Sequence, residues 1–254
     1  TNLNSMLYCE VPVEGGRPLE KGDYNIPGVP GTGAKIQVDF AETAGQGAGA
    51  LLPTGNPMDR LDVAGFRPID ASMIDIGNPH VFIRAKDVGM TGTETADEID
   101  ADKTLCDLLE KIRSHAAYSM GMISTPDRGK QESPAAPIIG MISPSQDYDA
   151  PLSDRTVSAS ECDFLSRLMF MQQTHKTYAG TSTVCTGIAS KLPGTIVHEA
   201  CRDDAQDRME VRIGHPSGVI ETESVVELNG NDYEVKRATL GRTARRIMAG
   251  TVYI

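Results

Sequence analysis

Hydrophobic and polar residues alternate along the first forty positions of this chain of 254 residues. Ile36, Val38 and Phe40 lie two positions apart, and Gly15–Gly16 interrupts the pattern. A period of two is typical of β-strands, and paired glycines are typical of turns. Residues 44–50 contain only Gly, Ala and Gln, without periodicity. We therefore predict meandering antiparallel strands up to about Phe40, and a domain boundary in this Gly/Ala-rich link.

The central part of the chain changes period and predicts a long helix. Apolar residues from Leu105 to Ala116 recur at helical spacing, acidic residues precede them, and Gly121 follows them. These features are typical of the start and end of an amphipathic helix, which we place at residues 101–120. Apolar runs on either side predict strands at residues 73–76, 81–83 and 138–142.

Two further helices are predicted in the second half. Ser158 and Glu161 have the spacing of a capping box, and the apolar residues Cys162, Leu165, Leu168 and Met169 then follow on one helical face. Residues 181–192 form a more apolar helix, whose composition predicts burial and which Pro193–Gly194 ends. The remaining runs predict strands at 195–200, 209–213, 219–228 and 233–238, a turn at 229–232, and a terminal strand that reaches Ile254.

This succession predicts an α+β fold, with antiparallel strands around one buried helix at residues 181–192. The formal net charge is -11 and no run of Lys or Arg is present. We therefore expect no nucleic-acid partner, because duplex binding depends on neutralising phosphates. The apolar runs are far shorter than the roughly 20 residues that span a bilayer. We expect no membrane partner and a soluble, cytoplasmic protein.

The cysteines indicate neither disulfides nor zinc. They are odd in number, widely spaced and never in a C-x-x-C arrangement, so a reducing compartment is expected. The five are Cys9, Cys106, Cys162, Cys185 and Cys201.

Positive charge is concentrated near the C-terminus, where Arg242, Arg245 and Arg246 interrupt a strand-like segment of an acidic chain. Guanidinium groups suit bidentate recognition of carboxylates. Because strand side chains alternate between faces, at most two of the three arginines can serve one ligand. The alternative is that they pair with surface carboxylates.

Polar clusters also stand where strands end and loops begin, which is where ligands are commonly held. One is Gly-Asn-Pro-His at 77–80 and another is His-Pro-Ser-Gly at 215–218. Both have a structural alternative, since Asn-Pro is a turn signal and Pro-Ser-Gly is typical of a tight hairpin turn. Gly-Thr-Ser-Thr at 180–183 opens the apolar helix, where free N–H groups suit an anion, although Ser and Thr are also ordinary N-caps.

Five segments, taken in order, carry a resemblance to a known family. They are Leu-Leu-Pro-Thr-Gly-Asn at 51–56, Ile-Gly-Asn-Pro-His-Val-Phe at 76–82, Leu-Pro-Gly-Thr at 192–195, Gly-His-Pro-Ser-Gly at 214–218 and Arg-Thr-Ala-Arg-Arg at 242–246. On these segments the chain resembles the 2-methylaconitate cis-trans isomerase family, which includes oxalomesaconate tautomerase, methylitaconate isomerase and aconitate isomerase. The resemblance runs from about Leu7 to Ile254.

The resemblance implies a diaminopimelate epimerase-like fold, in which two barrel-like domains, each around a central helix, face one another across a cleft. Residues 44–240 would form the second domain, with 181–192 as its central helix. Residues 1–43, joined by 241–254, would be a remnant of the first. Members of the family are longer at the N-terminus, where a general-base lysine and a cysteine are expected. The chain begins at Thr1, so we expect it to be a C-terminal portion of a longer protein.

The resemblance also implies isomerisation of a small unsaturated di- or tricarboxylate by allylic proton transfer, without a cofactor or metal, as in propionate catabolism. A homodimer is left open. The catalytic base is expected in the preceding segment, and the acid itself is not specified by any motif. The substrate-binding residues implied are Thr54, Asn56, Asn78, His80, Thr181, Ser182, His215, Ser217, Gly218 and Arg242.

Two alternatives to an isomerase stay open. A non-catalytic carboxylate-binding domain would have the same binding residues. A racemase or epimerase of this fold would need an acidic thiol near the start of the helix at 181–192. Cys185 falls about one turn inside this helix, on its apolar face, so we expect Cys185 to be buried and unreactive.

Overall fold

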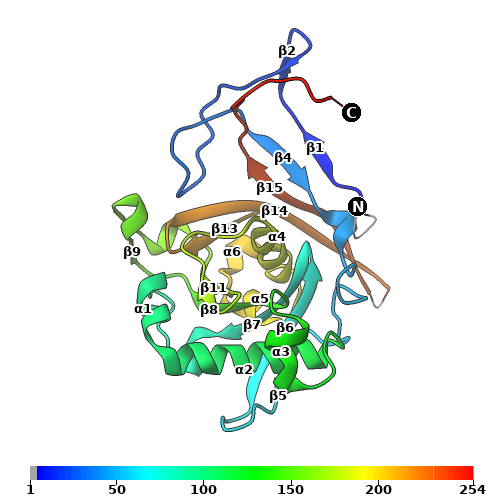
Figure 1. Cartoon of the computed structure of the whole chain (residues 1–254), viewed down its shortest axis with the longest axis vertical. Helices are drawn as coiled ribbons and strands as arrows, with labels where there is room; N and C mark the ends of the chain where they lie inside the picture. Colours follow the sequence, from blue (N-terminus) through cyan, green and yellow to red (C-terminus); the bar gives the residue numbers. More distant parts are fainter. Residues whose placement is uncertain (1–4, 231, 254) are drawn as a thin grey trace.

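The structure is a computed structural model that describes residues 5–230 and 232–253, and one large mixed sheet dominates it (Figure 1). Within the described residues this sheet has eleven strands. Most neighbours are antiparallel, but two pairs are parallel: β7 with β8, and β11 with β13. The order is β1 (Tyr8–Glu10), β4 (Ile36–Asp39), β15 (Asp232–Arg242), β14 (Gly218–Asn229), β13 (Glu210–His215), β11 (Phe164–Phe170), β8 (Ile138–Pro144), β7 (Asn78–Arg84), β6 (Ile69–Ile76) and β5 (Asp59–Leu61), with β12 (Gln173–Thr174) beside β11.

Two-stranded ribbons and short helices complete the architecture. The ribbons are β2 (Val13–Glu14) with β3 (Arg17–Pro18), and β9 (Tyr148–Ala150) with β10 (Arg155–Val157). The α-helices are α1 (Ala96–Ala101), α2 (Lys103–Ser119), α3 (Gly129–Glu132), α4 (Gly180–Ala189), α5 (Ile196–Ala200) and α6 (Asp203–Gln206). Short 3-10 helices occupy Ala41–Thr43, Ala85–Val88, Pro126–Arg128, Pro151–Ser153 and Ala159–Glu161.

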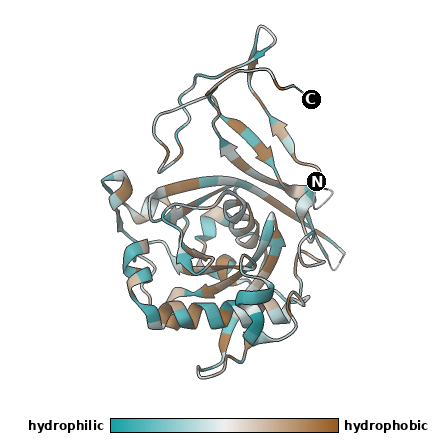
Figure 2. Ribbon diagram, viewed as in Figure 1, coloured by the Kyte–Doolittle hydropathy of each residue, from teal (hydrophilic) through white to brown (hydrophobic). Residues whose placement is uncertain are grey.

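The middle of the sheet is buried on both faces. On one face α4 packs against β6, β7, β13, β14 and β15, and its Cys185 and Ile188 join Ile74 of β6 in one core. On the other face α2 packs against β5 and β8, and its Ile112 belongs to the same core cluster as Met73 of β6. Hydrophobic and hydrophilic residues alternate along α2 in Figure 2, as expected of a helix with one buried stripe. Helix α4, in which every residue from Ser182 to Ala189 is buried, is therefore the buried helix that the sequence predicted.

The main predictions of elements are confirmed. The long helix is α2, the apolar helix is α4, and strands lie at each predicted position between residues 73 and 142 and between 209 and 238. The α+β class is confirmed as well, in the form of a large mixed sheet with helices on both faces. Asn231, in the predicted turn, and Ile254, at the end of the predicted terminal strand, lie outside the described residues.

Three predicted elements are wrong. The capping box of Ser158 and Glu161 exists, but it caps a single 3-10 turn, and the residues predicted as a helix after it form strand β11. Residues 195–200 form helix α5 rather than a strand, because the Thr195 hydroxyl accepts the N–H of His198 as an N-cap. Strand β15 ends at Arg242, so residues 243–253 form no terminal strand.

Candidate active site

Most of the predicted site residues lie along one edge of the sheet, the edge formed by the ends of its strands and not by an outer strand. Strand β7 begins there with Asn78, and the hairpin of β13 and β14 turns there between His215 and Gly218. Strand β15 runs antiparallel to β14 and therefore ends at the same edge with Arg242. Residues that are far apart in the sequence thus share one end of the sheet, where helix α4 also begins.

The beginning of α4 is tied to the beginning of β7 by two side-chain hydrogen bonds. Asn78 Nδ2 donates to Thr181 Oγ1 at 2.8 Å, and His80 Nε2 lies 2.7 Å from Ser182 Oγ. Gly77 makes the close approach possible, because a Cβ at this position would lie 3.2 Å from Thr181 Cβ. Asn78 remains exposed and Thr181 is half-buried, so both can meet a ligand.

His80 lies beneath this surface and is fully buried. Burial lowers the pKa of His80 to about 4, so the ring is neutral at pH 7. Its Nδ1 lies 2.8 Å from the Asn78 carbonyl, which only accepts, so Nδ1 carries the proton. Nε2 must then accept from the Ser182 hydroxyl. His80 and Ser182, both predicted to bind substrate, instead hold α4 against β7 with these side chains.

The first turn of α4 has unused hydrogen-bond donors. No side chain caps the helix, so the N–H groups of Gly180, Thr181 and Ser182 have no capping acceptor within the described residues. These donors and the positive end of the helix dipole together favour an anion. The predicted N-cap alternative therefore does not account for the polar residues at this helix start.

Arg242 adds a cation to the same place. A Cβ on Gly180 would overlap Arg242 Nη2, so the guanidinium rests against the first residue of α4. Arg242 is exposed, and it makes no ion pair with any residue that the structure describes. Arg246 instead pairs with Glu20 at 3.5 Å. Sequence reasoning identified Arg242 and included Gly180 in the motif at the helix start. It missed that the lack of a side chain at Gly180 gives the Arg242 guanidinium its space.

The hairpin residues form a second group. Ser217 N–H donates to His215 Nδ1 at 3.2 Å, and Ser217 Oγ donates to the Lys176 carbonyl at 2.6 Å, in the segment that leads to α4. Both side chains are buried. Burial lowers the pKa of His215 to about 3. The turn expected as an alternative for this motif is therefore present. His215 Nδ1 and Ser217 Oγ bond within the protein, whereas the buried His215 Nε2 has no hydrogen-bond partner among the residues that the structure describes.

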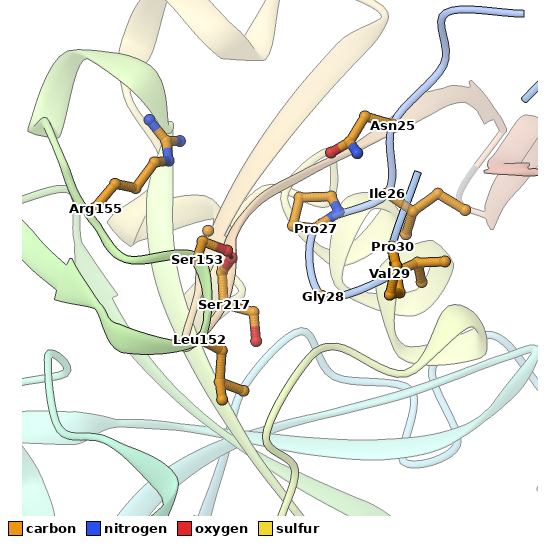
Figure 3. Close-up of a pocket in the computed structure, with 11 residues that line it drawn as sticks. Asn25, Ile26, Pro27, Gly28, Val29, Pro30, Leu152, Ser153, Arg155 and Ser217 are labelled. Atoms are coloured by element: carbon orange, nitrogen blue, oxygen red, sulfur yellow. Dashed lines mark hydrogen bonds between the residues drawn. The ribbon is translucent and has the colours of Figure 1, made fainter. Parts of the chain in front are cut away.

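A pocket of about 500 Å³ lies beside this hairpin (Figure 3). The segment from Asn25 to Pro30 forms one side, and Ser153 and Ser217 lie on the other. Gly218 also lines the pocket. Gly28 packs so closely that a Cβ there would lie 2.8 Å from Thr177 Cγ2. Asn78, Thr181 and Arg242 do not line this pocket, so the predicted residues at this edge form two groups, of which only the hairpin group borders the pocket.

Two predicted residues lie elsewhere. Thr54 Oγ1 and Asn56 Nδ2 both donate to Asp59, at 2.5 and 2.8 Å. Pro57, in the same loop, packs against Gly194, beyond the C-terminal end of α4. The structure therefore does not bring Thr54 and Asn56 to the start of the helix.

The predicted burial of Cys185 is confirmed. Its side chain is fully buried in the core around α4, and burial raises its pKa well above the ordinary value for a thiol. Its low reactivity stays a prediction.

Among residues 5–230 and 232–253, no group of three or more His, Cys, Asp or Glu side chains is placed to hold a metal ion. No helix in the same residues has the length and apolar character to cross a membrane.

The fold and this edge define an α+β protein whose candidate site is the open N-terminus of a buried helix. A model of the PrpF protein family matches residues 1–254, and the chain belongs to that family. It is 47% identical to 3-methylitaconate isomerase of Eubacterium barkeri and 35% identical to 2-methyl-aconitate isomerase of Shewanella oneidensis, over the whole of this chain. A crystal structure of methylitaconate-delta-isomerase matches it with a TM-score of 0.92 at 46% identity.

The matches also set the extent of the chain. All of this chain aligns, but it spans 65% of the length of the Eubacterium barkeri isomerase and 64% of the crystallised isomerase. The resemblance found in the sequence is therefore to members of this family, and it covers roughly two thirds of the length of these relatives.

Proposed function

We propose that this chain forms the carboxylate-binding wall of an isomerase that acts on small unsaturated di- or tricarboxylic acids of the methylitaconate or methylaconitate type. The observation that carries the proposal is the uncapped start of α4, with Asn78, Thr181 and Arg242 around it. Free N–H groups, an amide, a hydroxyl and an unpaired guanidinium together suit a carboxylate. The names of the relatives support this class of acid.

The proposed reaction removes a proton from a carbon next to an alkene and returns it after rotation or migration of the double bond. The carbanion spreads its charge into a carboxylate as a dienolate. Arg242 and the N–H groups of α4 would stabilise this charge, and Asn78 would orient the acid. We propose that the base belongs to the third of the relatives' length that this chain does not match.

We also propose the domain arrangement that the family implies. Residues 44–240 would be one domain wrapped around α4 as a barrel-like sheet, and residues 1–43 with 241–254 would belong to another. The support is that α4 packs against strands from both halves of the sheet order, β6 and β7 as well as β13 to β15.

A non-catalytic carboxylate-binding domain is the second candidate. One observation favours it: His80 and Cys185, two groups near the start of α4 that could transfer a proton, are both fully buried. A racemase or epimerase is less well supported, because the first turn of α4 contains no cysteine.

Calorimetry with trans-aconitate, together with an ultraviolet assay of isomerisation, tests the proposal. The chain should bind the acid and turn none of it over. Arg242→Lys keeps the charge but loses the planar fork, so affinity should fall by about 1.5–3 kcal/mol, on the order of tenfold to a hundredfold. Arg246→Lys is the matched control and should change affinity less than twofold. Equal effects of the two substitutions would remove Arg242 from the site, and turnover by this chain would contradict the proposed location of the base.

A further inference from the structure

Asp75 is a buried carboxylate that no prediction of the site included. It lies on β6, is 1% exposed, and forms no ion pair with any residue in the described part of the chain. A buried carboxylate without a cation is costly unless hydrogen bonds compensate it. Its partners therefore indicate why it is there.

The partners are backbone groups of the link at residues 44–50. Asp75 Oδ2 accepts the N–H groups of Gly47 at 2.7 Å and Ala48 at 2.5 Å. The main chain adds two more bonds, since the Gly45 N–H donates to the Asp75 carbonyl at 2.8 Å and the Asp75 N–H donates to Leu51 at 2.9 Å. The link is thus held by hydrogen bonds to the side chain, the carbonyl and the N–H of Asp75.

This link packs directly against strand β7, which begins at the proposed site. A Cβ on Gly47 would lie 2.8 Å from Pro79 Cγ, so the bare backbone of the link packs against the proline ring. Pro79 pairs directly with Asp75 across β6 and β7 and stands between Asn78 and His80. Next to it, the Gly77 N–H donates to the Thr43 hydroxyl at 2.9 Å, from the residue just before the link.

We propose that Asp75 is a positioning residue, which holds the link against Pro79 and so fixes the turn that presents Asn78 to the start of α4. Asp75 does not touch the ligand. The consequence for affinity rests on the proposed carboxylate site, whereas the clamp itself is a property of the backbone contacts and has its own measurement.

Amide hydrogen exchange, followed residue by residue by NMR, measures the clamp. Asp75→Asn keeps the shape of the side chain but removes its charge, so the amides of Gly47, Ala48 and Gly77 should all exchange at least about tenfold faster. Asp70→Asn, on the same strand, is the matched control, because Asp70 pairs with Arg60 and Arg84 and not with the link. It should leave all three amides unchanged. Faster exchange at Gly47 and Ala48 without Gly77 would overturn the positioning role.

Affinity for trans-aconitate gives the second measurement. Asp75→Asn should weaken binding about threefold to tenfold, and Asp70→Asn should not. Unchanged binding by Asp75→Asn, alongside wild-type binding, would overturn the proposal. A wild-type chain that binds no acid would refute the proposed function instead, and the exchange data would still test the clamp. If Asp75→Asn does not fold, the wild-type protein decides: the three amides should share one free energy of opening, and a separate value for Gly77 would refute the clamp.

Discussion

At the scale of single residues, the site depends on which polar groups remain unused. His80, Ser182, His215 and Ser217 are all buried. The polar side-chain atoms of His80, Ser182 and Ser217 bond within the protein, whereas His215 Nε2 has no partner among the described residues. Asn78, Thr181 and Arg242 keep accessible groups at the start of α4. We therefore propose two kinds of motif residue: buried residues that support the site, and accessible residues that would contact the ligand.

Gly180 should matter because of Arg242. Gly180→Ala introduces a Cβ that overlaps Arg242 Nη2 and lies 2.7 Å from Leu240 Cδ2. The guanidinium must move, so affinity for trans-aconitate should fall about tenfold, while the free energy of unfolding changes by on the order of 1 kcal/mol. In an Arg242→Ala background the same substitution should have little further effect on affinity. A full tenfold loss in that background would show that Gly180 acts independently of Arg242.

His80 should make stability depend on pH. Its pKa is lowered from 6.5 to about 4, so the unfolded chain takes up a proton near pH 6.5 and the folded protein only near pH 4. Above pH 6.5 the ring is neutral in both states, and the free energy of unfolding keeps its full value. As pH falls from 6.5 toward 4, the free energy of unfolding decreases by at most about 1.4 kcal/mol per pH unit. Urea unfolding between pH 7 and 4.5 should show a shallower loss for His80→Gln than for the wild type.

The control for this pH dependence is His115→Gln, on the half-buried His115 of α2. Its curve should run parallel to that of the wild type, since both keep His80. Parallel curves for His80→Gln and the wild type would contradict the account of His80 as a buried neutral ring.

At the scale of elements, the sequence predicted those helices whose apolar residues keep one period. Helix α2 has a single buried stripe, and α4 is apolar and ends before Pro193–Gly194. Strand β11 was predicted as a helix because both of its faces are buried: Leu168 joins the core around α4 and Met169 the core around α2. Such a strand has no polar alternation to reveal its period.

The same distinction applies to the site. The Asn78 and Thr181 motifs were visible in the sequence, but they contact one another across 103 positions, and only the sheet order brings them together. The roles of Gly180 and Asp75 depend on close packing between distant segments, which no local pattern encodes. A prediction from motifs thus identified most polar residues of this edge and missed what holds them in place.

The burial of helix α4 also determines the expected reactivity of the Cys185 thiol. The thiol is fully buried, whereas Cys9 is exposed. With a thiol reagent in excess, Cys9 should be modified first and Cys185 only at the rate of unfolding, as followed by mass spectrometry of peptides. Cys185→Ala should lower the free energy of unfolding by about 1–2 kcal/mol and leave acid binding unchanged. Rapid modification of Cys185 that a bound acid prevents would contradict this.

At the scale of the whole molecule, apolar surface is unevenly distributed. Within the described residues, eleven of the seventeen exposed large hydrophobic side chains lie at positions 6–29 or 247–253, among them Val13 at 64% and Tyr253 at 93% exposed. Figure 1 shows β1, β2, β4 and the C-terminal residues projecting from the part that surrounds α4. Two core clusters, by contrast, are centred on residues between 61 and 240. The two parts therefore differ in how much buried contact stabilises them.

This difference predicts the order of proteolysis. Cleavage requires local opening, and segments with few buried contacts open most readily. Brief digestion with a nonspecific protease should therefore cut first within residues 11–33 and 243–253, and should leave a fragment close to the proposed domain of residues 44–240. The link itself should resist, because Asp75 holds Gly47 and Ala48, and Asp75→Asn should add an early cut there while Asp70→Asn should not. Mass spectrometry of the fragments reads the outcome. Early cuts between residues 61 and 240 would contradict the proposed division, because they would place the least stable part of the chain inside the core around α4.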